Sequence, residues 1–371
     1  MSTTDEVKSN VVRVTDELRR RILSRDIAPA TKLPSIRKAA KRENVHPLTV
    51  AEAYRRLAAE GFVEVQPSVG AFVKELANEG EVLLCMGGPL EVSSYATHIA
   101  QHIVANEKIG DAPITVVRAA KGDLAFLDAI RSRAEKRKLR GCLLGSLEPE
   151  SVHAALELLN QYNVPCVTLS WRTGAPISVT HDEPMEIRQG TRYLIDRGCR
   201  SLLLLPLIRD SLTWRMLAEI FVATCEALDV KYELPTQAMR QQSNSLAVQE
   251  LQGARLAEHF LQGGLRHDGW LITDDWVGRG AIATLLRHGI RVPQQLQICT
   301  TARAGDSYPD VFGIPVARLE NDESRTAAVA CEILQRLMAG EQLEQPQMRL
   351  PSRLVTPEDA AERAAAMADH L

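Results

Sequence analysis

The chain has 371 residues, a formal net charge of −3 and 45% hydrophobic residues, which is the balance of a soluble globular protein. This length exceeds one ordinary core and predicts two or three domains. No apolar run reaches transmembrane length and the opening MSTTDEVKSNVV lacks the apolar stretch of a signal peptide, so we expect a cytoplasmic protein without a membrane partner.

Positive charge is concentrated at the start of the chain. Residues 1–75 hold five Lys and nine Arg against ten Asp and Glu, a net charge of +4, so the remainder carries −7. A basic module joined to an acidic body favours contact of that module with a polyanion.

Three helices are predicted within this module. Apolar residues at helical spacing mark residues 11–24, and a second helix over 35–43 is expected to turn Ile36, Ala39 and Ala40 inward. Asn44 tolerates the left-handed backbone of a tight turn, after which a third helix over 47–60 carries a core stripe that begins at Val50. Thr49 is expected on the opposite face of that helix.

The segment FVEVQPSVGAFVKE alternates around a turn and predicts a β-hairpin. Three helices with a tight turn, followed by a hairpin, make a winged helix-turn-helix, whose third helix enters the major groove of DNA.

The stretch KLPSIRKAAKRENVHPLTVAEAYRRLAAEGFVEVQPSVGAFV resembles the DNA-binding domain of the GntR family of transcription regulators. The resemblance covers residues 11–74 and implies contacts with bases and phosphates from seven residues: Ser35, Arg37, Lys38, His46, Leu48, Thr49 and Gly70. The wing departs from the family pattern, because Ser68-Val69-Gly70 replaces Gly-x-Gly and a basic wing residue is missing.

From Glu81 onward, short apolar runs alternate with helical patterns. The runs are VLLCM (82–86), ITVV (114–117), GCLLG (141–145), PCVTL (165–169), SLLLL (201–205), GWLIT (269–273) and LQICT (296–300). Such runs suit strands buried on both faces of a parallel sheet, so the body is predicted to be α/β, with ligands at the carboxyl ends of its strands.

The order of later motifs, from HDEPMEIRQGTRYLIDRG through DGWLITDDWVGRG to LPSRLVTPED, resembles the effector domain of LacI/GalR regulators. That resemblance implies a two-lobed, periplasmic-binding-protein-like fold over 81–356, with crossings between the lobes near 181–186 and 300–320. Residues 76–80 are then a linker behind the head of residues 1–75, and 357–371 a C-terminal tail.

The same resemblance places the ligand in the cleft between the lobes. Carried over position by position, it implies ligand contacts from Ser170, Arg172, Arg215, Asp274, Asp275, Trp276 and Arg303. Ser170 and Arg303 stand at or beside positions where the family has aspartates that accept hydrogen bonds from sugar hydroxyls. Loss of these acceptors and gain of Arg favours an acceptor-rich, anionic ligand such as a sugar acid or phosphorylated sugar.

Other classes of function find little support in the sequence. There is no G-x-G-x-x-G, phosphate loop or nucleophile elbow, so we expect no cofactor and no enzyme. The seven Cys lie without C-x-x-C pairs, and His98 and His102 have no acidic partner that would complete a metal site.

A GntR-type head on a LacI-type body is the arrangement of arabinose-repressor-like regulators. It implies a repressor that binds a palindromic operator as a homodimer and responds to a small metabolite. A constitutive DNA-binding protein with a degenerate cleft is the alternative, and an enzyme that uses the α/β body is a more remote one.

Overall fold

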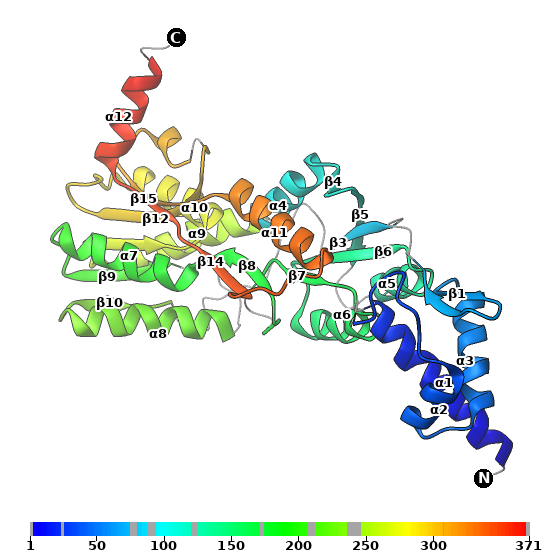
Figure 1. Ribbon diagram of the computed structural model, residues 1–371. Coiled ribbons are helices and arrows are strands. Elements are labelled where there is room, and N and C mark those ends of the chain that lie inside the picture. The colour runs from blue at the N-terminus through cyan, green and yellow to red at the C-terminus, as the bar shows by residue number, and fades with distance from the viewer. Residues whose placement is uncertain are drawn as a thin grey trace.

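The structure is a computed structural model that describes residues 3–23, 26–74, 80–87, 94–119, 125–170, 174–205, 212–235, 246–306 and 308–368. A small helical head lies at one end of the molecule, and two α/β lobes follow it (Figure 1). None of the helices in these ranges is long and apolar enough to cross a lipid bilayer.

The head has the predicted order of elements. It contains α1 (Thr3–Leu23), α2 (Ile36–Glu43), α3 (Pro47–Ala59), β1 (Val63–Gln66) and β2 (Gly70–Val73), with β1 and β2 paired antiparallel. Val14 and Leu18 of α1 pack with Val50 and Leu57 of α3 in one apolar cluster. Ile36 departs from the prediction, because it is 40% exposed while Ala39 and Ala40 are buried.

The first lobe is a seven-stranded sheet in the order β14-β8-β7-β6-β3-β5-β4. Its strands are β3 (Glu81–Gly87), β4 (Lys108–Ile109), β5 (Ala112–Ala119), β6 (Leu139–Gly145), β7 (Cys166–Thr168), β8 (Ser178–His181) and β14 (Gln347–Leu350). Separate apolar clusters unite the sheet with α4 (Ser94–Ala105) and α11 (Glu323–Met338), and with α5 (Ala125–Glu135) and α6 (Pro149–Gln161).

The second lobe is a six-stranded sheet in the order β10-β9-β11-β12-β13-β15. Its strands are β9 (Ser201–Leu205), β10 (Lys231–Glu233), β11 (Gly269–Ile272), β12 (Gln297–Arg303), β13 (Ala317–Asn321) and β15 (Arg353–Val355). Its helices are α7 (Glu183–Asp196), α8 (Leu212–Ala227), α9 (Leu246–Leu261), α10 (Asp275–Arg287), the 3-10 turn η3 (Asp310–Phe312) and the terminal α12 (Pro357–Ala368). The predicted α/β class is confirmed, and all seven apolar runs fall on strands.

The close approach of α9 to α10 depends on glycine. A Cβ at Gly253 would collide with the carbonyl of Val277, and one at Gly280 would collide with the carbonyl of Glu250. The two helices therefore pack backbone to backbone, which fixes the N-terminal end of α10 after β11.

Three short segments join the lobes. The chain passes from β8 to α7 at 181–183, from β13 to α11 at 321–323, and from β14 to β15 at 350–353. The side chains of these segments meet, because the Ser352 hydroxyl contacts Glu186 and lies 2.5 Å from Asn321 Oδ1. Glu186 is buried, and burial raises its pKa despite the opposing effects of His181 and these hydrogen bonds.

A second buried carboxyl begins α11 directly after its crossing. Glu323 is 5% exposed and its Oε1 has no hydrogen-bond partner within the described chain. Burial raises its pKa to about 7, while Arg303 opposes the rise. The folded protein therefore holds this proton more tightly than the unfolded chain does.

This carboxyl predicts a pH-dependent stability. Because the folded pKa lies above the ordinary value of 4.5, the contribution of Glu323 is fully present below about pH 4.5 and is lost as the pH rises to about 7. The variant Glu323→Gln should gain about 2 kcal/mol relative to wild type between pH 5 and pH 8 in urea unfolding. Glu332→Gln, on an exposed part of the same helix, is the control. An equal offset at both pH values for Glu323→Gln would contradict the assignment.

Candidate functional site

Side-chain caps fix the turn between α2 and α3. Ser35 Oγ accepts the backbone N–H of Lys38 at 3.4 Å, and His46 Nδ1 accepts that of Leu48 at 3.2 Å. Asn44 takes the left-handed conformation with φ of 53°, as the sequence predicts. Because Nδ1 of His46 is an acceptor here, the neutral ring carries its hydrogen on Nε2, which is then available as a donor.

The face around this turn presents part of the predicted DNA-contact set. Arg37 and Lys38 are exposed, and no acidic residue of the described chain pairs with them. Leu48 is 72% exposed at the first turn of α3. These residues and the capping residues Ser35 and His46 therefore lie together on an open surface of the head.

Thr49 does not lie on this open surface, contrary to the sequence expectation. It is 3% exposed and lies on the floor of a small hollow that Val11 of α1 and His46 also line. The reason is that α1 packs across α3, which buries a position that helical periodicity alone leaves on the outer side.

The hairpin has a basic neighbour that the sequence pattern did not reveal. The backbone of Lys32 pairs with that of Phe72 as an isolated antiparallel β-bridge. Lys32 Nζ lies 5.9 Å from the centre of the Phe72 ring. A Cβ at Gly70, where φ is 141°, would lie 2.8 Å from Lys32 Cε. Lys32 is 38 positions from Gly70, so local spacing gave no sign that it supplies positive charge beside the wing.

A cluster of charges lies where the two lobes meet. Arg303 ends β12 and bonds Asp306 at 2.6 Å, and its Nε lies 3.7 Å from Asp275 of α10. Arg279 bonds the same Asp306 oxygen at 3.2 Å. Arg303 also contacts His98 Nε2, which belongs to α4 of the other lobe. The cluster therefore links the two lobes directly.

The charges of the cluster shift one another's protonation. Burial raises the pKa of Asp275, against the opposing pull of Arg303 and Arg279. Burial acts upward on Asp306 too, but the Tyr308 backbone N–H and the two Arg outweigh it, so the pKa of Asp306 is lowered. Burial, followed by Arg303, lowers the pKa of His98. A neutral His98 can accept a hydrogen bond from the Arg303 guanidinium.

Several buried polar atoms of this region have no hydrogen-bond partner among the described residues. They are Asp275 Oδ2, Trp276 Nε1, Arg279 Nε, Arg303 Nε and Glu323 Oε1. Buried polar atoms are nearly always hydrogen-bonded in folded proteins. Five such atoms where the two lobes meet therefore leave both donors and acceptors without a hydrogen-bond partner in one region.

The remaining predicted cleft residues are placed differently. Asp274 caps α10 by accepting the Val277 N–H at 2.9 Å, so at least one of its oxygens is used within the helix. Arg215 is exposed on α8 and makes no ion pair with Asp275 or Asp306. Ser170 follows β7, whereas Arg172, with Trp171, lies outside the described residues. Trp214 is 5% exposed and belongs to a core cluster.

His98 is the cleft residue that sequence reasoning missed. It was weighed as a metal ligand with His102, yet it meets Arg303, 205 positions further along the chain. No group of His, Cys, Asp and Glu within the described ranges has the arrangement of a metal site.

The head also contacts the first lobe. The guanidinium of Arg137, in the loop after α5, lies over the Phe62 ring, 2.7 Å from its centroid. Arg19 lies 5.9 Å from the same centroid and pairs with Glu60 at 2.9 Å. Burial lowers the pKa of Arg137 to about 10, and the nearby Arg19 adds to this. The contact therefore joins the end of α3 to lobe 1.

Comparison with known proteins divides the chain in the same way. Residues 10–73 match the family described as bacterial regulatory proteins, gntR family, and residues 191–358 match the periplasmic binding protein-like domain. An uncharacterized HTH-type transcriptional regulator, YhcF of Bacillus subtilis, is 30% identical over 66 residues, which cover 18% of this chain and 54% of that protein. The chain thus spans about half the length of this curated relative.

Solved structures resemble the body. A LacI family transcriptional regulator from Bifidobacterium animalis has a TM-score of 0.60 at 17% identity, covering 74% of this chain and 95% of that one. The lac repressor dimer bound to operator and an anti-inducer gives 0.61 at 17%, over 76% and 94%. GanP, a glucose-galactose binding protein from Geobacillus stearothermophilus, gives 0.59 at 14%, over 76% and 99%.

At these identities the structural likeness establishes the fold of the body, while the domain matches identify its parts. The chain joins a GntR-type helix-turn-helix domain to a periplasmic-binding-protein-like domain of LacI-type fold, which is the architecture of a DNA-binding transcription regulator.

Proposed function

We propose that this protein is a ligand-responsive transcription regulator, a repressor that binds a palindromic operator as a homodimer. The exposed face around Ser35, Arg37, His46 and Leu48 binds DNA, and a small metabolite binds between the lobes. The observation that carries the proposal is the set of five buried polar atoms without partners in the cleft beside the His98–Arg303 contact.

The cleft chemistry favours a hydroxyl-bearing ligand with one acidic group, in the class of sugar acids and phosphorylated sugars. Arg303 and Arg279 are planar donors suited to carboxylate or phosphate. Asp275 and Glu323 supply acceptors, or donors when protonated, for hydroxyl groups. The acidic group of the ligand takes the place of His98 on Arg303, while Asp306 stays paired with Arg303 and Arg279.

Ligand binding is coupled to DNA binding through closure of the lobes. The His98–Arg303 contact spans the cleft, so a ligand that bonds Arg303 changes the contact between lobe 1 and lobe 2. Lobe 1 in turn holds the head through Arg137 and Phe62. Such coupling requires a ligand that binds the two arrangements with different affinity.

A constitutive regulator with a degenerate cleft is the second candidate. One observation favours it: the two Arg and the two Asp of the cluster already neutralise one another within the protein. In that case no metabolite of the proposed class would stabilise the protein, and DNA binding would be independent of ligand.

The DNA-binding face is tested by Arg37→Ala. Loss of a base or phosphate contact should weaken binding by about 1–3 kcal/mol, which is roughly 5- to 150-fold. The readout is fluorescence anisotropy with a duplex that wild-type protein selects from a random pool. Thr49→Val is the matched control, because Thr49 is buried, and it should change affinity less than about twofold. Equal losses in both variants would contradict the proposed face.

The cleft is tested by Arg303→Gln in a thermal-shift screen with gluconate, glucose 6-phosphate and glucose at millimolar concentration. The acidic ligands should stabilise wild type, and Arg303→Gln should reduce that shift because it removes the charged donor. A ligand at 100 times its Kd stabilises by about 2.7 kcal/mol. Arg291→Gln, at an exposed position of lobe 2 outside the predicted ligand contacts, should keep the full shift. Stabilisation by glucose alone would exclude the anionic class.

The contact between head and body is tested by Arg137→Ala. A desolvated cation–π contact contributes about 2 kcal/mol, so the equilibrium constant for docking of the head should fall about 30-fold. Small-angle X-ray scattering should then give a larger radius of gyration with unchanged thermal stability. Lys136→Ala, at the exposed neighbouring position, should match wild type. An unchanged radius for Arg137→Ala would show that other contacts hold the head.

A further inference from the structure

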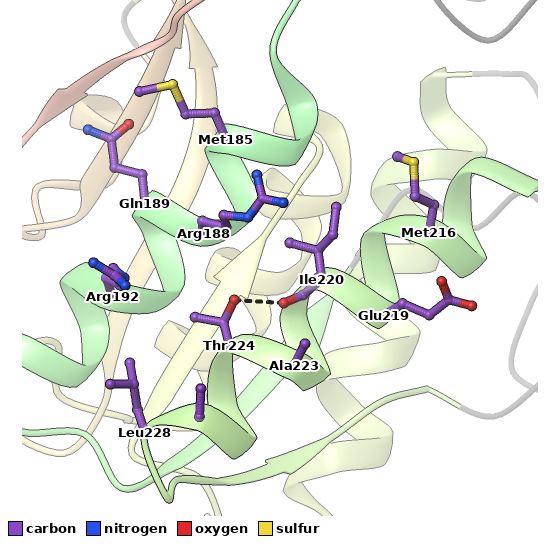
Figure 2. Close-up of a pocket in the computed structure, with 11 residues that line it drawn as sticks. Met185, Arg188, Gln189, Arg192, Met216, Glu219, Ile220, Ala223, Thr224 and Leu228 are labelled. Atoms are coloured by element: carbon purple, nitrogen blue, oxygen red, sulfur yellow. Dashed lines mark hydrogen bonds between the residues drawn. The ribbon is translucent and has the colours of Figure 1, made fainter.

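An open apolar groove runs between α7 and α8 on the second lobe, away from the charged cluster of the cleft. Its volume is about 680 Å³. One wall and the floor are formed by side chains of α8 and of the residue that follows it, namely Met216, Ile220, Ala223, Ala227 and Leu228. Thr224 donates its hydroxyl to the Ile220 carbonyl at 2.7 Å, so this polar group is already satisfied (Figure 2).

The two sides of the groove carry opposite charge. Arg188 and Arg192 stand one helical turn apart on α7, and Glu219 stands on α8 (Figure 2). No ion pair of the described chain uses either of these Arg, and both are exposed. Met185 and Leu228 remain 41% and 43% exposed at the ends of the groove. An apolar floor with a basic rim fits an amphipathic helix with an acidic flank.

The chain itself contains such a helix. α12 has three acidic residues in its first two turns, Glu358, Asp359 and Glu362, and helical spacing places Glu358 and Glu362 on one side. Ala360 and Ala361 lie on the adjacent face. Small alanine side chains allow a helix to approach a narrow groove closely.

α12 has little packing within its own chain. Its described residues join none of the apolar clusters. Glu358 pairs with Arg197 at 3.0 Å, which ties the start of α12 to the C-terminal end of α7. From there α12 projects away from α7 and α8 (Figure 1). The groove between α7 and α8 of the same chain is therefore not covered by α12.

Length and position match between the two features. α12 has 12 residues and the groove follows α8 from Met216 to Leu228, so each extends for about 18 Å at 1.5 Å per residue. The helix also leaves the body beside the Arg192 end of the groove, because Arg197 is at the end of the same helix α7. A two-fold axis near this point would lay each α12 across the groove of the other copy.

We propose that the α7–α8 groove is a self-association surface that receives α12 from a second copy of this chain. Glu362 faces Arg188 and Arg192 while Glu358 keeps its ion pair with Arg197 of its own chain, and Ala360 and Ala361 cover Ile220 and Ala223. This inference rests on the homodimer of the proposed function, for which it names a contact surface, and it involves neither the DNA-binding face nor the charged cluster.

The first test measures self-association of the full chain by sedimentation velocity over a range of concentrations. Removal of residues 357–371 should abolish the association that α12 mediates. The double variant Arg188→Glu, Arg192→Glu should raise the dissociation constant of that association about tenfold or more. Arg325→Glu, an exposed charge reversal on α11, should leave it unchanged. Unchanged association in the charge-reversed variant would overturn the proposal.

A crosslinking test identifies the occupant. Chains with Ala223→Cys and chains with Ala361→Cys are mixed and oxidised, and the expected product is a disulfide-linked pair of one chain of each kind. Either variant oxidised by itself should give a lower yield of disulfide-linked dimer than the mixture does. If the pair does not form, or if a single chain with both substitutions closes only on itself, α12 does not occupy the groove of a second copy.

Discussion

The contact of the Ser352 hydroxyl with Glu186 and Asn321 joins all three segments that connect the lobes. Glu186 follows the first crossing, Asn321 precedes the second and Ser352 lies in the third. The Ser352 hydroxyl donates to Glu186 and lies 2.5 Å from Asn321 Oδ1. Burial raises the pKa of Glu186 against the effect of these hydrogen bonds. This contact holds the connections between the lobes together.

The arrangement of buried elements could be predicted because the central strands of both sheets are apolar on both faces. Val82, Leu84, Leu203 and Leu271 are all fully buried, and a run of such residues has few alternatives to the inside of a parallel sheet. The crossing strands were harder to predict. β13 has the sequence ARLEN with Arg318, Glu320 and Asn321 all buried. Arg318 pairs with Glu320 and Asp310, and Asn321 contacts Ser352, and no sequence pattern reveals these partners.

The charged cluster was predicted in part, for a similar reason. Arg303 and Asp275 each follow a recognisable strand, and the carboxyl ends of neighbouring parallel strands meet, as the pairing of β11 with β12 requires. His98 could not be assigned to the same place, because its position depends on how two lobes face each other. Thr49 shows the same limit in the head, where packing of α1 across α3 decides which side of a helix is buried.

Arg303 makes contacts of different strength within its own lobe and across to the other lobe. Arg303 contacts Asp306 and Asp275 within its own lobe but His98 in the other lobe. Burial and the positive charge of Arg303 both lower the pKa of His98, so this His is a neutral acceptor and contributes less to the cluster than a carboxylate would. The interlobe contact is therefore weaker than the contacts within lobe 2. In the proposed function, the acidic group of the ligand replaces His98 on Arg303, and the charges of lobe 2 stay paired.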